Sequence, residues 1–161
     1  AYFEAYSVTG DEIFTGTALT SSTYWKAGGN ASISSVTGGV ATIKFPSSDA
    51  TGSDYISFNK GYLGSKIEQG HKYRLTFQAK SSVSDTYIVA LFGESLDITD
   101  SVSSDGVIYG EYNGGVLSTS YKTITLDFVA DKRDSTVSDG LLITSSKACT
   151  INIRSISLKE V

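Results

Sequence analysis

Hydrophobic and polar residues alternate along several short segments of this chain. In the clearest of them, residues 72–80, every second position is apolar: Tyr73, Leu75, Phe77 and Ala79. Residues 122–129 repeat the pattern with Ile124, Leu126 and Phe128. A period of two places the apolar side chains on one face of a strand and the polar ones on the other. Both segments are therefore predicted to be half-buried β-strands.

Glycines separate the other extended segments. The two glycines of Thr37-Gly38-Gly39 supply the positive φ angles of a tight turn, so residues 31–35 and 40–45 are predicted to form a hairpin. Gln69-Gly70-His71 is a predicted turn that leads into the strand at Lys72. Further short strands are predicted at 55–59, 107–112 and 141–145.

Two segments depart from simple alternation. Residues 86–92 read TYIVALF, which is apolar in both phases and predicts a central strand with both faces covered. Near the end of the chain, Ile151 and Ile153 share one phase while Ile156 and Leu158 share the other. This slip of one residue predicts a β-bulge near Arg154-Ser155.

These elements define the fold class. Apolar residues never recur at helical spacing over three turns, and no internal repeat is visible, so the chain is predicted to be all-β with about nine or ten strands. A single domain over residues 1–161, with residues 1–9 as an N-terminal arm, is predicted to form an antiparallel β-sandwich of the jelly-roll type. The predicted core consists of Tyr73, Leu75, Phe77, Ile124, Leu126, Phe128, Ile151 and Ile153.

Composition excludes several function classes. The net charge of -4 and the absence of any run of Lys and Arg argue against nucleic acid as a partner. A single cysteine, Cys149, and a single histidine, His71, rule out an internal disulfide and a zinc site. No apolar run is long enough to cross a bilayer, so no membrane insertion is expected. We expect no cofactor, and we expect Cys149 to be a small buried residue.

The order of several motifs resembles carbohydrate-binding modules of families four, nine and twenty-two. The resemblance covers roughly residues 10–161 and is carried by Trp25, by Gly39-Val40-Ala41-Thr42-Ile43, by Gly70 to Lys80 in the form G-x-x-Y-x-L-x-F-x-A-K, and by Ile153 to Val161. It implies a galactose-binding-like β-jelly roll that lacks catalysis and holds glycans in a groove on one sheet. Similar domains also occur in phage tail and head proteins.

The resemblance implies expectations for two residues, Trp25 and Arg154. Trp25 corresponds to a tryptophan that usually packs in the sandwich, so it is expected in the core, although sugar stacking is the alternative. Arg154 stands where such modules usually carry an Asp that helps to hold a calcium ion. Because a guanidinium cannot ligate a cation, no metal site is predicted.

A glycan site requires flat aromatic faces and planar polar side chains that make paired hydrogen bonds. The candidate groove places Arg74 and Gln78, from one face of the strand 72–80, between tyrosines of neighbouring strands: Tyr55, Tyr87 and Tyr109. Glu111 and Tyr112, in the glycine-rich segment 109–115, complete the candidate ligand-binding residues. The alternatives are that Arg74 and Gln78 are ordinary solvated residues, that the tyrosine rings are buried, and that 109–115 is a plain hairpin turn.

Catalysis finds little support in the sequence. His71 lies in a turn, which disfavours a Ser-His-Asp arrangement. A glycosidase needs two carboxylates across a cleft, and Glu94, Asp97, Glu111 and Asp127 are more simply explained as solvating charges. Asp97, Asp100 and Asp105 form an acidic segment without the spacing of a calcium loop. The chain is therefore predicted not to be an enzyme.

Two functions remain open. The first is a carbohydrate-binding-module-like protein on a phage particle, where it acts as a capsid decoration or fibre protein, contacts capsid or tail proteins and adheres weakly to host polysaccharide. The apolar outer face of residues 86–92 and the absence of a tag or secretion signal favour it. The alternative is a glycan-binding accessory module of a secreted polysaccharide-degrading enzyme. These functions place the chain on a virion surface or outside the cell.

Overall fold

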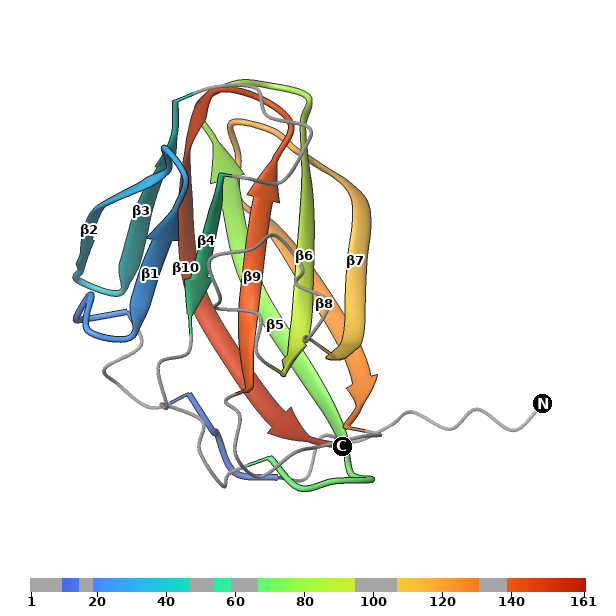
Figure 1. The fold of residues 1–161 in the computed structure, drawn as a ribbon. Coiled ribbons are helices and arrows are strands. Elements are labelled where there is room, and N and C mark those ends of the chain that lie inside the picture. The colour runs from blue at the N-terminus through green and yellow to red at the C-terminus, as the bar shows by residue number, and fades with distance from the viewer. Residues whose placement is uncertain (1–9, 15–18, 47–53, 59–66, 95–106, 131–138) are drawn as a thin grey trace.

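The structure, a computed structural model, describes residues 10–14, 19–46, 54–58, 67–94, 107–130 and 139–161. Ten strands form two five-stranded antiparallel sheets that pack face to face (Figure 1). Sheet I contains, in spatial order, β1 (Trp25–Gly28), β4 (Tyr55–Phe58), β9 (Asp139–Ser145), β6 (Thr86–Glu94) and β7 (Val107–Leu117). Sheet II contains β2 (Ser32–Thr37), β3 (Val40–Phe45), β10 (Cys149–Glu160), β5 (Lys72–Ser81) and β8 (Lys122–Val129). The predicted all-β jelly-roll sandwich is confirmed.

The core lies between the two sheets. All eight predicted core residues are buried, with at most 4% of their surface exposed. Phe92 of sheet I stacks on Phe128 of sheet II with ring centroids 4.5 Å apart, which ties the layers together. Trp25 is also buried and packs edge-on against Phe58, so its predicted place in the core is confirmed. Across the described part of the chain, no helix is long and apolar enough to span a membrane.

The glycine hairpin and the bulge form where the sequence predicts them. Thr37 pairs with Val40, and the two intervening glycines, Gly38 and Gly39, have φ angles of 62° and 84°. A two-residue turn with positive φ at both positions matches the twist of the flanking strands. The first strand of this hairpin spans 32–37 instead of the predicted 31–35.

The bulge in β10 changes which residues face outward. The pairing of β10 with β5 shifts between Arg154 and Ser157, and Ser155 has a φ of 56°. Before the bulge Ile151 and Ile153 face the core, and after it Ile156 and Leu158 do so. Strand β10 thus keeps its apolar side chains buried along its whole length. Its outward-facing residues are even-numbered before the bulge and odd-numbered after it.

Strand β6 lies between β9 and β7, and its outer face is covered at one end only. Leu91 is buried on this face, where it packs with Leu142 and Tyr55. Tyr87, at the other end, is 53% exposed. The prediction that both faces of residues 86–92 are covered is therefore right for Leu91 and wrong for Tyr87. The sequence pattern also missed β1, because four residues are too few to show alternation.

Candidate functional site

The candidate ligand-binding residues lie on both sheets. Arg74 and Gln78 belong to β5 of sheet II, whereas the candidates from residues 55, 87, 109, 111 and 112 belong to β4, β6 and β7 of sheet I. The inner faces of the two sheets pack on each other, so their outer faces point in opposite directions. The predicted groove, in which tyrosines of neighbouring strands flank Arg74 and Gln78, is therefore wrong, because β5 is paired with β10 and β8.

Arg74 and Gln78 are held by other side chains of sheet II. Arg74 donates two hydrogen bonds to Asp127, from Nε to Oδ1 over 2.7 Å and from Nη2 to Oδ2 over 3.0 Å. The hydrogen bond and the charge of Arg74 lower the pKa of the Asp127 carboxyl. Gln78 accepts a hydrogen bond of 2.8 Å from Nε of Arg154 and lies near Thr123. These residues form a fixed polar network on an exposed sheet face.

Tyr121, which sequence reasoning missed, extends this network. The guanidinium carbon of Arg154 lies 3.6 Å from the centroid of the Tyr121 ring, and Nζ of Lys80 lies 4.8 Å from it. Both distances are within the range of cation–π attraction. No local pattern in the sequence marks this contact, because Lys80 lies in β5, Arg154 lies in β10 and Tyr121 directly precedes β8.

Four of the five sheet I candidates are buried or half-buried, or have side chains outside the described residues. Tyr55 is 1% exposed and belongs to the small cluster with Leu91 and Leu142. Tyr112 is half-buried and packs against the main core. For Tyr109 and Glu111 the structure describes the backbone in β7, while their side chains lie outside the described residues.

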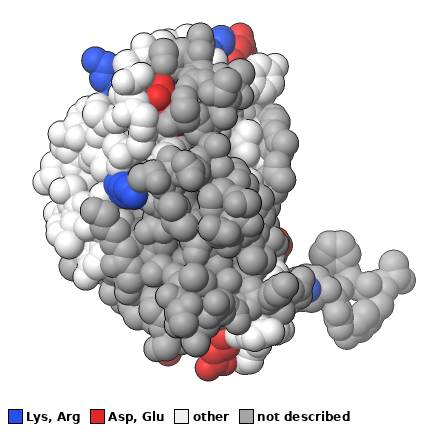
Figure 2. Space-filling view, viewed as in Figure 1, with Lys and Arg blue, Asp and Glu red and all other residues white. Residues whose placement is uncertain are grey.

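Tyr87 is the candidate that offers an accessible ring. Its backbone is fixed to the turn after β9, because its N–H donates to Oγ of Ser146 and its carbonyl accepts from the N–H of Ser146. Among the described side chains on the outer face of sheet I, only Lys26 is charged. Figure 2 shows one side of the molecule, with Lys and Arg in blue and Asp and Glu in red on its described surface. An exposed ring on a face whose described side chains carry a single charge, that of Lys26, suits contact with the apolar side of a sugar.

Comparison with known proteins supports the architecture. No protein-family model and no curated protein matches the sequence. Solved structures do match. One is the N-terminal cellulose-binding domain of β-1,4-glucanase C from Cellulomonas fimi, at 18% identity and a TM-score of 0.62 over 94% of this chain and 97% of that one. Another is a family-twenty-two xylan-binding domain from Paenibacillus barcinonensis, at 9% identity and a TM-score of 0.64 over 96% of this chain and 97% of that one.

The chain has the fold of a carbohydrate-binding module. The family-twenty-two module of a Clostridium thermocellum xylanase, solved with xylohexaose and joined to a second module, matches 95% of this chain and 29% of that one at 15% identity and a TM-score of 0.65. The resemblance to families four and twenty-two that the motifs carry is thus confirmed at the level of the fold.

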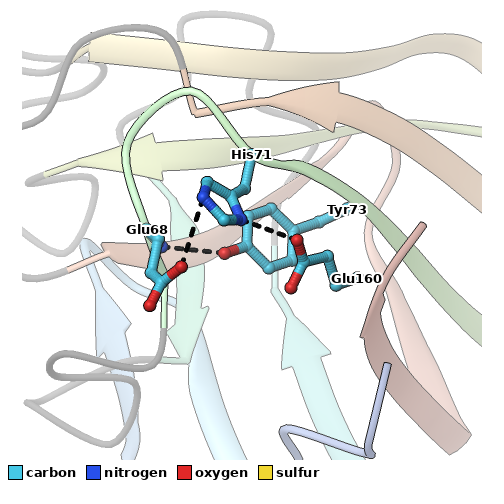
Figure 3. Close-up of polar contacts among 4 residues, drawn as sticks. All are labelled: Glu68, His71, Tyr73 and Glu160. Carbon is cyan, nitrogen blue, oxygen red and sulfur yellow. Dashed lines mark hydrogen bonds and ion pairs between the residues drawn. The ribbon is translucent and has the colours of Figure 1, made fainter. Parts of the chain in front are cut away.

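His71 occupies a cluster at one end of this module fold (Figure 3). Its Nδ1 lies 2.6 Å from Oε1 of Glu160 and its Nε2 lies 3.2 Å from Oε2 of Glu68. The backbone N–H of Glu68 donates to the hydroxyl of Tyr73 over 2.8 Å. Both ring nitrogens of His71 therefore face carboxylates, and neither is available to activate a hydroxyl nucleophile. The cluster joins the start of β5 to the end of β10.

This cluster predicts a pH dependence of stability. The hydrogen bond to Glu160, followed by the charges of Glu160 and Glu68, raises the pKa of His71 above its ordinary value. A raised pKa means that the folded state holds the proton more tightly, so the stabilisation is complete below the ordinary pKa and is lost as the pH rises through the folded-state pKa. Between pH 6 and pH 9 the thermal midpoint of the wild type is expected to fall further than that of His71→Gln, as measured by differential scanning fluorimetry. Parallel curves for the two proteins would contradict the assignment.

The other candidate residues have simple structural positions. Cys149 is buried with its Sγ 3.4 Å from Oγ of Ser145, as predicted for a small core residue. Asp97, Asp100 and Asp105 lie outside the described residues, as does the side chain of Glu94. Within the part of the chain that the structure describes, no group of three or more His, Cys, Asp and Glu side chains is placed to hold a metal ion.

Proposed function

We propose that this protein is a non-catalytic glycan-binding module that holds a neutral sugar chain against the outer face of sheet I. The observation that carries the proposal is the exposed ring of Tyr87 on a sheet face whose described side chains are almost uncharged. A sugar ring has an apolar side that packs on an aromatic face, and its hydroxyls then reach polar groups around the ring. The solved structures with this fold include a cellulose-binding and a xylan-binding domain, which supports a neutral polysaccharide as the partner.

The sheet face that carries Tyr87 is tightly packed beside it. Tyr55, Leu91 and Leu142 are buried on this face, and the half-buried Val89, two residues from Tyr87, packs against them. Two hydrogen bonds fix the backbone of Tyr87: its N–H donates to Oγ of Ser146, and its carbonyl accepts from the N–H of Ser146. A surface that is already ordered loses little conformational entropy on binding, which favours affinity from a small contact area.

Strand β7 is the proposed neighbour of the stacked sugar. In the register of β6 and β7, Tyr87 pairs with Val116 and Leu91 pairs with Glu111. Within this proposal, Tyr109 and Glu111 stay candidates for contacts at the edge of the glycan, whereas Tyr112 packs against the main core and Arg74 and Gln78 belong to the opposite sheet. We also propose that the protein acts outside the cell, where polysaccharides are found.

The sequence left two functions open, and one of them has support: an accessory module of a polysaccharide-degrading enzyme. The Clostridium thermocellum xylanase structure joins a module of this fold to a second module. A role in a phage particle, with capsid or tail partners on a virion surface, has no observation in its favour. The apolar outer face that motivated it is largely occupied within the sheet, because Leu91 packs on Leu142 and Tyr55.

The proposal predicts the effect of removing the Tyr87 ring. In isothermal titration calorimetry, the wild type is expected to bind cellohexaose or xylohexaose, and Tyr87→Ala to bind it at least about tenfold more weakly, since a buried aromatic contact is a typical binding hot spot. Tyr121→Ala is the matched control on sheet II and is expected to keep the affinity of the wild type. Binding of neither sugar at millimolar concentration, or equal affinity of Tyr87→Ala and the wild type, would refute the proposal.

A further inference from the structure

The outer face of sheet II is strongly basic, although the whole chain has a net charge of -4. The outward positions of β3, β5 and β10 carry six basic side chains: Lys44, Lys72, Arg74, Lys80, Arg154 and Lys159. Among the described residues at outward positions of the same sheet, the one carboxylate is Asp127 on β8. We call this surface the basic face. It points away from the outer face of sheet I, on which Lys26 is the one charged side chain among the described residues.

A hollow of about 210 Å³ lies in the basic face between β5 and β10. Its lining consists of two cross-strand pairs, Arg74 opposite Lys159 and Thr76 opposite Ser157. Two cations and two hydroxyls therefore surround one shallow space. The β10 bulge makes this lining, since the shift at Ser155 turns Ser157 and Lys159 outward and into line with Thr76 and Arg74.

The charges around the hollow leave one cation uncompensated. Like charges directly opposite each other on paired strands repel. Asp127 approaches Arg74 from β8, on the side away from Lys159, and uses Nε and Nη2 of the guanidinium. Lys159 has no ion-pair partner among the described residues. On the other side of β10, Oε2 of Glu12 accepts the backbone N–H groups of Leu158 and Phe14.

An anion in the hollow would remove this imbalance. It would lie between the ammonium of Lys159 and the guanidinium of Arg74, whose Nη1 makes no hydrogen bond within the described residues. The hydroxyls of Thr76 and Ser157 can donate to the same anion or accept from a neighbouring hydroxyl of the ligand. Two charge-assisted contacts beside two hydroxyls suit an acidic group that is attached to a hydroxyl-rich ring.

We propose that the basic face is a second glycan-binding surface, specific for acidic polysaccharide, and that the hollow takes the carboxylate or sulfate group of one sugar. Lys72, Lys80 and Arg154 lie farther along the same face and serve further acidic sugars of the chain. A nucleic acid fits less well, because base stacking needs an open aromatic face and the Tyr121 ring already holds Arg154 and Lys80. This surface does not depend on the Tyr87 site.

The test is calorimetry at low salt with hexagalacturonate, which carries carboxylates, and a heparin-derived hexasaccharide, which carries sulfates. The wild type is expected to bind at least one of them, with affinity that falls as NaCl is raised because exposed charges are screened. Lys159→Gln is expected to weaken this binding about tenfold, since charge-assisted hydrogen bonds have that effect. Ser157→Ala, which keeps every charge, is expected to weaken it about threefold.

Two controls separate this site from bulk charge and from the Tyr87 site. Lys147→Gln removes the same charge from the turn at the opposite end of β10 and is expected to bind as the wild type does. Tyr87→Ala is expected to keep acidic binding, whatever it does to neutral sugars. The inference is overturned if neither acidic ligand binds, if Lys159→Gln and Lys147→Gln behave alike, or if single-stranded DNA of equal charge binds more tightly. None of these outcomes bears on the binding of neutral sugars.

Discussion

Phe92→Ala is expected to lower the free energy of unfolding by about 3 to 5 kcal/mol, the usual cost of removing a large buried ring. Phe92 is fully buried and stacks on Phe128 of the opposite sheet at 4.5 Å, with 25° between the ring planes. Phe128 in turn stacks on Tyr73 at 5.7 Å. The substitution would therefore open a cavity at the point where rings from both sheets meet.

Urea unfolding followed by circular dichroism measures this effect. Tyr87→Ala is the matched control, because it removes an aromatic ring from the same strand at a position that is 53% exposed. It is expected to change stability by less than about 1 kcal/mol. If the two substitutions cost the same, Phe92 does not lie between the sheets and the two-layer arrangement is wrong.

Local features of this fold can be predicted from sequence because they depend on neighbouring residues. A period of two sends Tyr73, Leu75 and Phe77 to one face of the strand, whatever that strand pairs with. The turn at Gly38 needs only two residues that tolerate positive φ, and the bulge at Ser155 follows from a slip in the apolar phase. Each prediction uses a few consecutive residues, and each is confirmed by the structure.

The alternation of apolar and polar residues within a strand does not determine which sheet the strand joins. That depends on pairings between distant residues. Gln78 contacts Arg154, which is 76 residues away along the chain, whereas the tyrosines expected beside it lie in the other sheet. A correct prediction that residues 72–80 form a strand with Arg74 and Gln78 on its outer face therefore gave a wrong groove. The order of the strands follows from the jelly-roll connections, in which consecutive strands such as β5 and β6 belong to different sheets.

The basic face could be predicted from the sequence only in part. Lys72, Arg74 and Lys80 share the outward phase of one predicted strand, so three of its five polar positions are basic. Lys159 and Arg154 join them only after β10 pairs with β5 and the bulge resets the phase. The net charge of -4 conceals this separation, because it sums over both sheet faces and the connecting segments.

Gly28→Ala is expected to destabilise the fold by about 1 to 3 kcal/mol, as overpacking of a filled site does. A Cβ on Gly28 would lie 2.0 Å from Cε1 of Tyr55, so the buried ring would have to move toward Leu91 and Leu142. In a Tyr55→Leu background the clash is absent, and the same substitution is expected to cost much less. A double-mutant cycle with urea unfolding measures this coupling. Additive effects would show that the ring does not fill the space above Gly28. The cycle also probes the cluster of Tyr55, Leu91 and Leu142, because a displaced Tyr55 ring would disturb their packing on the sheet face that carries Tyr87.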